Sequence, residues 1–205
     1  MIQTVMIIIL GYCLGSILFG EFFLKKFKHK DIRRESSDGN PGTFNAFASG
    51  GFLCGSLTLL CDILKGMLPV LLYLHLNHGN RENALLALVM CAPVLGHAFP
   101  LYTGFFGGGK AIAVSFGVLL GFVPDLRPVL ILAVFYILFS AMRIQPHARR
   151  SILTFFCSMV AFIFFVREAA IKMGMFLISL LVIEKHLAKQ IGGNERIEQD
   201  IPNKI

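Results

Sequence analysis

The feature that most constrains this chain is a series of long apolar stretches separated by short polar segments. A helix needs about 20 mostly apolar residues to cross a bilayer, and the hydrocarbon core requires every backbone polar group to be bonded within the segment. Seven such stretches are visible, at residues 2–24, 51–74, 84–101, 111–124, 126–142, 151–167 and 169–184. They predict an all-α integral membrane protein of about seven transmembrane helices.

The scarcity of charge supports this class. Charged residues make up 15% of the 205 residues and hydrophobic residues 56%, whereas soluble domains contain roughly 25% charged residues. A soluble domain of this length could not bury so much apolar side chain. We therefore exclude an ordinary soluble protein and a disordered chain, and expect residues 1–205 to form a single membrane domain.

The distribution of Lys and Arg predicts the orientation, because positive charge is retained on the cytoplasmic side of a membrane. With the N-terminus outside, the inner segments hold fourteen of these residues and the outer segments four, while Lys65 lies inside a stretch. The asymmetry favours an outside N-terminus, a cytoplasmic C-terminus and inner placement of both glycine-rich segments.

The first glycine-rich segment contains Gly39, Asn40, Gly42, Thr43 and Asn45. Glycine allows the backbone to approach a ligand closely, and successive amide groups can form a concave site for an anion. We consider it a candidate phosphate-binding segment. The alternative is an ordinary turn that begins the second helix, with an asparagine as its cap.

The second segment, Gly104–Lys110, satisfies the spacing of a nucleotide-binding P-loop. The next residue is Ala111, where a magnesium-binding Ser or Thr belongs, and this argues against an ATPase. Gly108, Gly109 and Lys110 immediately before a helix still suit a phosphate, because amides, the positive helix end and an ammonium group coincide. The alternative is a flexible inner loop.

Ionisable residues also occur within the apolar stretches. Asp62 and Lys65 are three residues apart, so a helix would bring them together as an ion pair, either structural or beside a substrate. His97 and His186 lie near the ends of two stretches and are candidates for orienting a substrate or for a structural hydrogen bond. His75, His78 and His147 are interpreted as loop residues.

No metal or cofactor is expected. The five cysteines lie in or beside apolar stretches without a C-x-x-C pair, which favours free thiols that pack as small apolar groups. No group of His, Asp or Glu has the spacing of zinc ligands.

Taken together and in order, the polar segments resemble one family, the bacterial membrane acyl-phosphate:glycerol-3-phosphate acyltransferases (PlsY family). The similarity covers nearly the whole chain. It rests on Gly15-Ser16-Ile17, Asp31-Ile32-Arg33, Gly39-Asn40-x-Gly42-Thr43-x-Asn45, Asp62-x-x-Lys65-Gly66, Gly96-His97-x-Phe99-Pro100, Gly108-Gly109-Lys110-Ala111 and His186.

The resemblance implies transfer of a fatty acyl group from acyl phosphate to the 1-hydroxyl of glycerol 3-phosphate, giving 1-acyl-glycerol 3-phosphate (lysophosphatidate). It implies His186 and Lys110 as catalytic residues. It implies a substrate- and phosphate-binding set of Gly39, Asn40, Gly42, Thr43, Asn45, His97, Gly108, Gly109 and Lys110. The expected partners are the two substrates and the lipid bilayer, without nucleic acid, and the expected location is the bacterial plasma membrane with the site facing the cytoplasm.

The chain departs from the family pattern at Asp38, Ala48, Gly107, Val114 and Lys189, where the family usually has serine, arginine, lysine, threonine and asparagine. Arg33 or Arg34 is our candidate for replacing the missing guanidinium. These departures motivate an alternative, a catalytically impaired relative that regulates or binds a ligand. A small transporter is a third hypothesis, for which no inverted repeat is visible.

Overall fold

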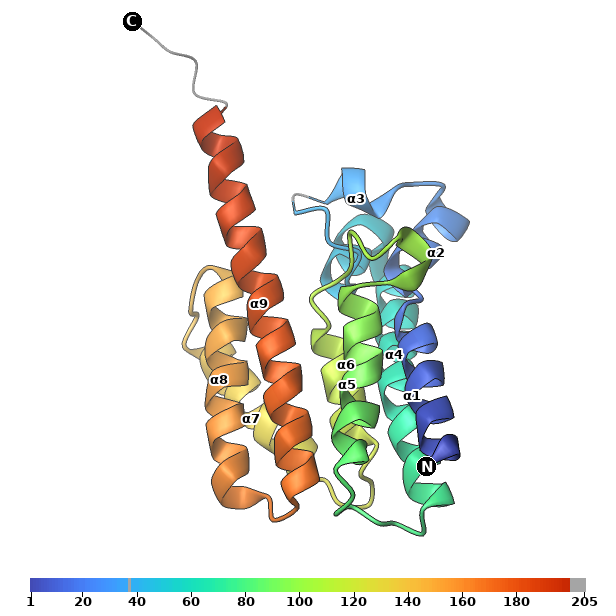
Figure 1. Cartoon of the computed structure of the whole chain (residues 1–205). Helices are drawn as coiled ribbons and strands as arrows, with labels where there is room; N and C mark the ends of the chain where they lie inside the picture. Colours follow the sequence, from blue (N-terminus) through green and yellow to red (C-terminus); the bar gives the residue numbers. More distant parts are fainter. Residues whose placement is uncertain (37, 200–205) are drawn as a thin grey trace, which may run out of the picture.

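The computed structural model describes residues 1–36 and 38–199, with side chains described to residue 188, and this part of the chain is helical without strands (Figure 1). The helices are α1 (Ile2–Gly15), α2 (Phe19–Lys28), α3 (Ile32–Glu35), α4 (Thr43–Leu76), α5 (Leu85–Ala98), the 3₁₀ turn η1 (Leu101–Thr103), α6 (Ile112–Leu120), α7 (Arg127–Ala141), α8 (His147–Phe165) and α9 (Ala169–Gln199).

The helices form a bundle of two groups. Helices α1, α4, α5 and α6 pack together, and α7, α8 and α9 form a second group that contacts the first through α5 with α9 and α6 with α7. The short helices α2 and α3 lie at the end of the bundle opposite the N-terminus, and α9 ends at this same end (Figure 1). The start of α1 and the end of α9 are therefore at opposite ends.

Membrane character is evident from helix length and composition. Within the described residues, Ile2–Lys28, Thr43–Leu76, Leu85–Thr103 and His147–Phe165 are long and apolar enough to cross a membrane, and Arg127–Ala141 is a shorter apolar helix. Helix α6, with nine residues, is only ~14 Å long, about half of a bilayer core. Helices occur at all seven expected positions, while the number of crossings stays a prediction.

The first expected span, residues 2–24, is not one continuous helix. Helix α1 ends at Gly15 and α2 begins at Phe19. At the break, the Lys65 ammonium donates to the carbonyl of Ile17 at 2.6 Å, and the Ser16 hydroxyl accepts from the Leu101 amide at 3.1 Å. The interruption is stabilised because Lys65 satisfies a backbone carbonyl that it exposes, and the Ser16 side chain joins it to η1.

The helix that follows the first glycine-rich segment begins earlier than the predicted span. Residues from Thr43 onward are helical, and α4 bends at Gly51, whose φ of 75° and ψ of −172° lie outside the helical region. A positive φ costs little for glycine. The predicted span, beginning at residue 51, therefore corresponds to the part of α4 after this bend.

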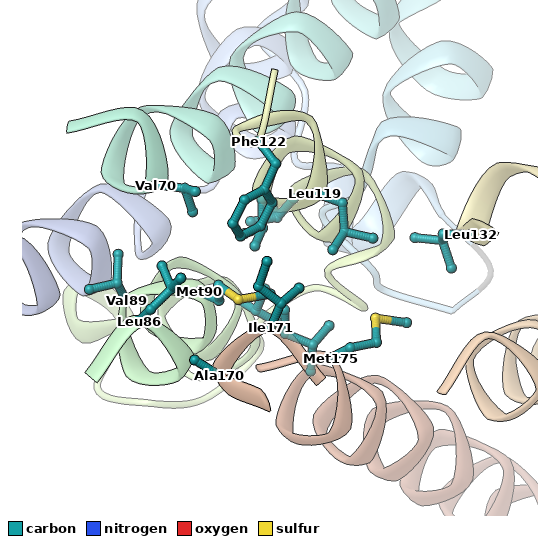
Figure 2. Close-up of a cluster of buried hydrophobic side chains, with 14 of the residues drawn as sticks. Val70, Leu86, Val89, Met90, Leu119, Phe122, Leu132, Ala170, Ile171 and Met175 are labelled. Atoms are coloured by element: carbon teal, nitrogen blue, oxygen red, sulfur yellow. The ribbon is translucent and has the colours of Figure 1, made fainter. Parts of the chain in front are cut away.

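The core fills the contact between the two helix groups (Figure 2). Phe122, Met90, Ile171 and Met175 are fully or almost fully buried there. Helix α9 approaches α5 closely at Gly174, where a Cβ would collide with the Met90 sulfur. All five cysteines are free thiols, as predicted.

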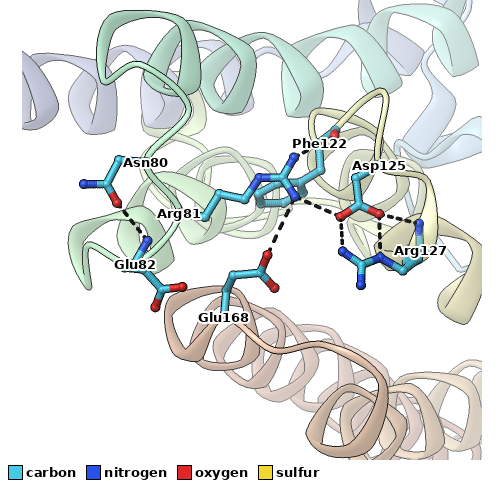
Figure 3. A network of polar contacts seen from close by, with 7 residues as sticks. All are labelled: Asn80, Arg81, Glu82, Phe122, Asp125, Arg127 and Glu168. Atoms are coloured by element: carbon cyan, nitrogen blue, oxygen red, sulfur yellow. Dashed lines mark hydrogen bonds and ion pairs between the residues drawn. The ribbon is translucent and has the colours of Figure 1, made fainter.

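The loops at the N-terminal end of the bundle are joined by ion pairs (Figure 3). Arg81 lies 2.8 Å from the Asp125 carboxylate and 3.8 Å from that of Glu168, and Arg127 also contacts Asp125 at 2.8 Å. The Arg127 guanidinium hydrogen bond, with further bonds from the Arg127 amide and from Arg81, holds the pKa of Asp125 below its usual value. The network connects three inter-helix loops.

Candidate functional site

A cavity of about 630 Å³ lies between the two helix groups, on the side where α4 faces α7 and α8. The cavity is lined by residues that precede α4 and by residues of α4, α5, α6, α7, α8 and α9, so most of the chain contributes to it. A cavity of this size is within the range of small-molecule sites. Asp38, Asp62, Lys110, Arg150, His97 and His186 supply most of its titratable groups.

Three helices begin at this cavity. The residues that precede their first turns are Gly42 for α4, Ala111 for α6 and Pro146 for α8, and all three line the cavity. Among the residues that the structure describes, no side chain caps any of these helix starts. The first amide groups of a helix lack partners within it and carry partial positive charge, so three such ends favour anionic ligands.

Asp38 organises the first glycine-rich segment. Its Oδ1 accepts hydrogen bonds from the Asn40 amide at 3.1 Å and from Asn45 Nδ2 at 2.7 Å, and its Oδ2 lies 2.9 Å from Lys110 Nζ. Asn45 also donates to the Asn40 carbonyl at 2.8 Å. The Asp38 carboxylate thus accepts from hydrogen-bond donors that we predicted would bind a phosphate. Through its contact with Lys110 it also joins the two glycine-rich segments.

The second glycine-rich segment lies directly on the end of α5. The Gly109 amide donates to the His97 carbonyl at 2.9 Å. A Cβ at Gly109 would collide with His97 Nε2, and one at Gly108 would collide with the Ala98 carbonyl. Glycine is required here because no side chain fits between the segment and α5, and the resulting close approach places Lys110 at the cavity.

A buried polar group supports His97. The Lys65 ammonium lies 2.8 Å from Asp62 Oδ1 and 2.9 Å from His97 Nδ1, so the predicted pair forms and extends to the histidine. An ammonium group can only donate, so His97 Nδ1 accepts and Nε2 of the neutral ring carries the proton. Asp62 and His97 line the cavity, and His97 is therefore arranged as a hydrogen-bond donor.

His186 is oriented in the opposite sense. It is 2% exposed on α9, and its Nδ1 lies 2.8 Å from the Val182 carbonyl. A carbonyl only accepts, so Nδ1 carries the proton and Nε2 is the acceptor nitrogen of the neutral ring. His186 lines the cavity and is arranged as a candidate base.

The structure brings most of the predicted site residues together. The cavity-lining members of that set are Asn40, Gly42, Thr43, Asn45, His97, Lys110 and His186. Gly39, Gly108 and Gly109 are not part of its lining but belong to the segments that form it. Val114 is buried in the core, while the side chain of Lys189 is outside the described residues.

Arg33 and Arg34 do not supply a guanidinium to the cavity. Arg33 donates to the Gly107 carbonyl at 2.8 Å and pairs with Glu21 at 2.9 Å, and Arg34 is an exposed partner of Asp31. Arg33 instead fixes the second glycine-rich segment against α2 and α3.

The cavity guanidinium comes from Arg150 in α8, which the sequence suggested only as a marker of topology. Its Nη2 donates to His147 Nδ1 at 2.7 Å, and its Cζ lies 5.7 Å from the centre of the Tyr136 ring. His147 is the first residue of α8 and His75 lies in the last turn of α4, so neither is the loop residue that we predicted. The sequence signal for this residue was the pair Arg149-Arg150 before an apolar stretch, but such a pair is also typical of arginines that only mark the cytoplasmic side of a helix.

The chain is similar to curated glycerol-3-phosphate acyltransferases. One from Streptococcus thermophilus is 46% identical over 122 residues, covering 60% of this chain and 55% of the relative. One from Syntrophomonas wolfei is 36% identical over 132 residues, covering 63% and 64%. The chain thus matches between half and two thirds of the length of these relatives.

Solved structures resemble the whole bundle. The glycerol 3-phosphate form of PlsY (YgiH), described as an integral membrane glycerol 3-phosphate acyltransferase, superposes with a TM-score of 0.79 at 27% identity and covers 93% of each chain. Its lysophosphatidic acid form gives 0.77 at 25% identity with the same coverage. Because the family model described as glycerol-3-phosphate acyltransferase matches residues 5–191, the chain belongs to this family of integral membrane proteins.

Proposed function

We propose that this protein transfers a fatty acyl group from acyl phosphate to glycerol 3-phosphate in phospholipid biosynthesis. One observation carries the proposal: three uncapped helix starts meet at a cavity that also holds Lys110 and an acceptor histidine, His186. Both substrates carry a phosphate group, and the reaction needs anion binding and a proton acceptor more than a covalent intermediate.

The donor phosphate binds at the start of α6. Lys110 lies beside this helix end, and the His97 Nε2 proton is directed toward the adjacent Gly109. The ammonium group, the helix end and the imidazole N–H stabilise the negative charge that grows on the phosphate as it leaves. Asp38 gives up part of its contact with Lys110 when the substrate phosphate binds.

Acyl transfer then requires one displacement. The 1-hydroxyl oxygen of glycerol 3-phosphate attacks the carbonyl carbon and forms the ester C–O bond. The bond between that carbon and the phosphate oxygen breaks, and inorganic phosphate leaves with the electron pair. His186 Nε2 takes the hydroxyl proton, which is the role that its hydrogen bond to Val182 favours.

The acyl chain lies along the apolar part of the cavity. Phe44, Phe47, Leu59, Phe116 and Tyr136 line it between α4, α6 and α7. Phe44 is 70% exposed, so this wall reaches the surface of the helix bundle. A hydrocarbon chain can therefore remain in contact with lipid while its phosphate occupies the polar end.

We further propose seven membrane crossings in one domain, with the N-terminus outside and the cavity at the cytoplasmic face. The excess of Lys and Arg in the alternate segments supports this orientation. Reporter fusions after residues 79 and 146 test it, because the first should report an external position and the second a cytoplasmic one. The same reporter signal from both fusions would contradict it.

The activity is tested with the purified full chain, palmitoyl phosphate and glycerol 3-phosphate. We expect 1-palmitoyl-glycerol 3-phosphate and inorganic phosphate in equal amounts, and no transfer from palmitoyl-coenzyme A. Transfer only from the thioester would contradict the proposed donor. Absence of transfer from both donors would contradict the activity and favour a ligand-binding relative.

A further inference from the structure

We propose that Arg150 binds the phosphate group of the acyl acceptor, glycerol 3-phosphate, at the start of α8. The identity of the ligand rests on the proposed function. The position of the site rests on the charges and the unsatisfied hydrogen-bond donors at the cavity. The proposal places the acyl acceptor at the start of α8 and the acyl donor at the start of α6.

Among the described residues, Arg150 is the cation lining the cavity that has no carboxylate partner. Lys110 lies 2.9 Å from Asp38, and the Asp62 carboxylate lies 2.8 Å from Lys65. In the part of the chain that the structure describes, no carboxylate lies within 4.0 Å of the Arg150 guanidinium. A second anionic group entering the cavity is therefore attracted chiefly to Arg150.

The guanidinium is held in place by neutral groups. Its Nη2 donates to His147 Nδ1 at 2.7 Å, and its Cζ lies 5.7 Å from the Tyr136 ring centre. Arg150 Nε is buried and has no hydrogen-bond partner among the described residues. A buried N–H without an acceptor is unfavourable, and a phosphate oxygen matches the planar donor fork of arginine.

The start of α8 adds donors at the same place. Pro146, His147, Ala148 and Ser151 line the cavity together with Arg150, and this helix start has no side-chain cap. The helix has 19 residues, long enough for its first amide groups to carry appreciable partial positive charge. Backbone amides and the guanidinium can therefore contact one phosphate.

The exposure of this edge indicates which phosphate binds. Pro146 and His147 are exposed, so the α8 side of the cavity is open at the surface formed by the α7–α8 connection. Glycerol 3-phosphate is small, doubly charged and water-soluble, whereas the acyl phosphate carries a hydrocarbon chain that favours the apolar wall. The α8 edge suits the acceptor, and the α6 start with Lys110 suits the donor.

The test compares Arg150→Ala and Arg150→Gln with Arg149→Ala. Arg149 is the exposed neighbour on the same helix and does not line the cavity, so its loss removes equal charge without the proposed contact. We expect both Arg150 variants to raise the KM for glycerol 3-phosphate by about tenfold to a hundredfold, the effect of losing a charged hydrogen bond. The KM for palmitoyl phosphate and the values for Arg149→Ala should change less than about twofold.

Binding of glycerol 3-phosphate, measured by isothermal titration without the donor, separates this proposal from the proposed activity. If the natural sequence transfers no acyl group but both Arg150 variants bind glycerol 3-phosphate more weakly than it does, the proposed activity is wrong and the proposed binding site is supported. The site is overturned if both Arg150 variants bind like Arg149→Ala, if only the KM for palmitoyl phosphate rises, or if the natural sequence does not bind glycerol 3-phosphate.

Discussion

The two ends of the helix bundle use arginine in opposite ways. At the end that contains the N-terminus, Arg81 lies between the carboxylates of Asp125 and Glu168, so its charge is neutralised within the protein. At the cavity end, Arg150 contacts only an imidazole and an aromatic ring among the described groups. A neutralised guanidinium holds loops together, whereas one without a carboxylate is suited to an incoming anion.

Helix starts differ in the same way. At the N-terminal end of the bundle, Asn83 accepts from the Leu85 amide at 2.9 Å and Asp125 accepts from the Arg127 amide at 3.1 Å. The starts of α4, α6 and α8 at the cavity have no such side-chain acceptor. One backbone amide at each of the α5 and α7 starts is therefore bonded by a side chain, whereas the starts of α4, α6 and α8 leave such donors for a ligand.

Lys110→Ala should have the largest effect of the substitutions that test this comparison. The change removes the ammonium group from the donor site and leaves the negative charge of Asp38 there without the Lys110 ion pair. We expect kcat/KM for acyl transfer to fall by about a hundredfold to a thousandfold, with the thermal unfolding midpoint nearly unchanged.

Lys185→Ala is the matched control, because Lys185 contacts the Phe99 ring and does not line the cavity. Asp38→Asn keeps an Oδ1 acceptor for Asn40 and Asn45 but removes the charge opposite Lys110. It should lower the KM for acyl phosphate. Equal activity of the Lys110→Ala and Lys185→Ala variants would show that Lys110 does not act in the proposed donor site.

His186→Gln should have the next largest effect. Glutamine keeps a polar side chain but cannot accept the hydroxyl proton, so we expect kcat to fall by about a hundredfold with little change in either KM. The measurement is the steady-state rate against each substrate. A raised KM with unchanged kcat would instead make His186 a binding residue.

Arg81→Ala should affect stability rather than activity. Arg81 joins three loops, and its loss leaves Glu168 without its ion-pair partner. We expect about 1 kcal/mol of destabilisation, or a lower unfolding midpoint by ~2–4 °C, with both KM values unchanged. The comparison of the two ends would fail if this variant lost acyl transfer while remaining folded.

Asp125→Asn should have the smallest effect and a characteristic pH dependence. The folded pKa of Asp125 is lowered by its bonds with Arg127 and Arg81, so its stabilisation is present above the unfolded value of about 3.9 and is lost as the pH falls toward the folded value. We expect a difference of about 0.5 kcal/mol from the natural sequence at pH 7 that shrinks below about pH 4. Unfolding midpoints at several pH values test this, and a constant difference would contradict the assigned cause.

The long apolar stretches and the placement of charge were sufficient to predict an all-helical membrane protein with helices at seven positions. They could not locate the break between α1 and α2, because residues 2–24 contain a single charged residue, Glu21, and no proline. That break depends on Lys65 and Leu101, which contact it from distant segments. Likewise, the sequence could not show that Asp38 bonds both Asn45 in the first turn of α4 and Lys110 before α6, because this contact joins segments far apart in the chain.

For the site, glycine spacing and isolated histidines identified two segments and two imidazoles that the structure brings to one cavity. The sequence could not distinguish Arg150 from other cytoplasmic charges, nor Arg33 as a residue that fixes a loop. Whether a guanidinium faces a cavity or a carboxylate depends on neighbours far away in the chain.

The sequence by itself determined the membrane class, the helix positions and the residue types available for binding phosphate, because the length of an apolar stretch and the residues that interrupt it are local properties. The tertiary structure alone decided that Asp38 pairs with Lys110, that the starts of α4, α6 and α8 converge, and that Arg150 has no carboxylate partner among the described residues. These features arise when segments distant in sequence pack together, since charge neutralisation and access to a cavity are properties of the assembled bundle.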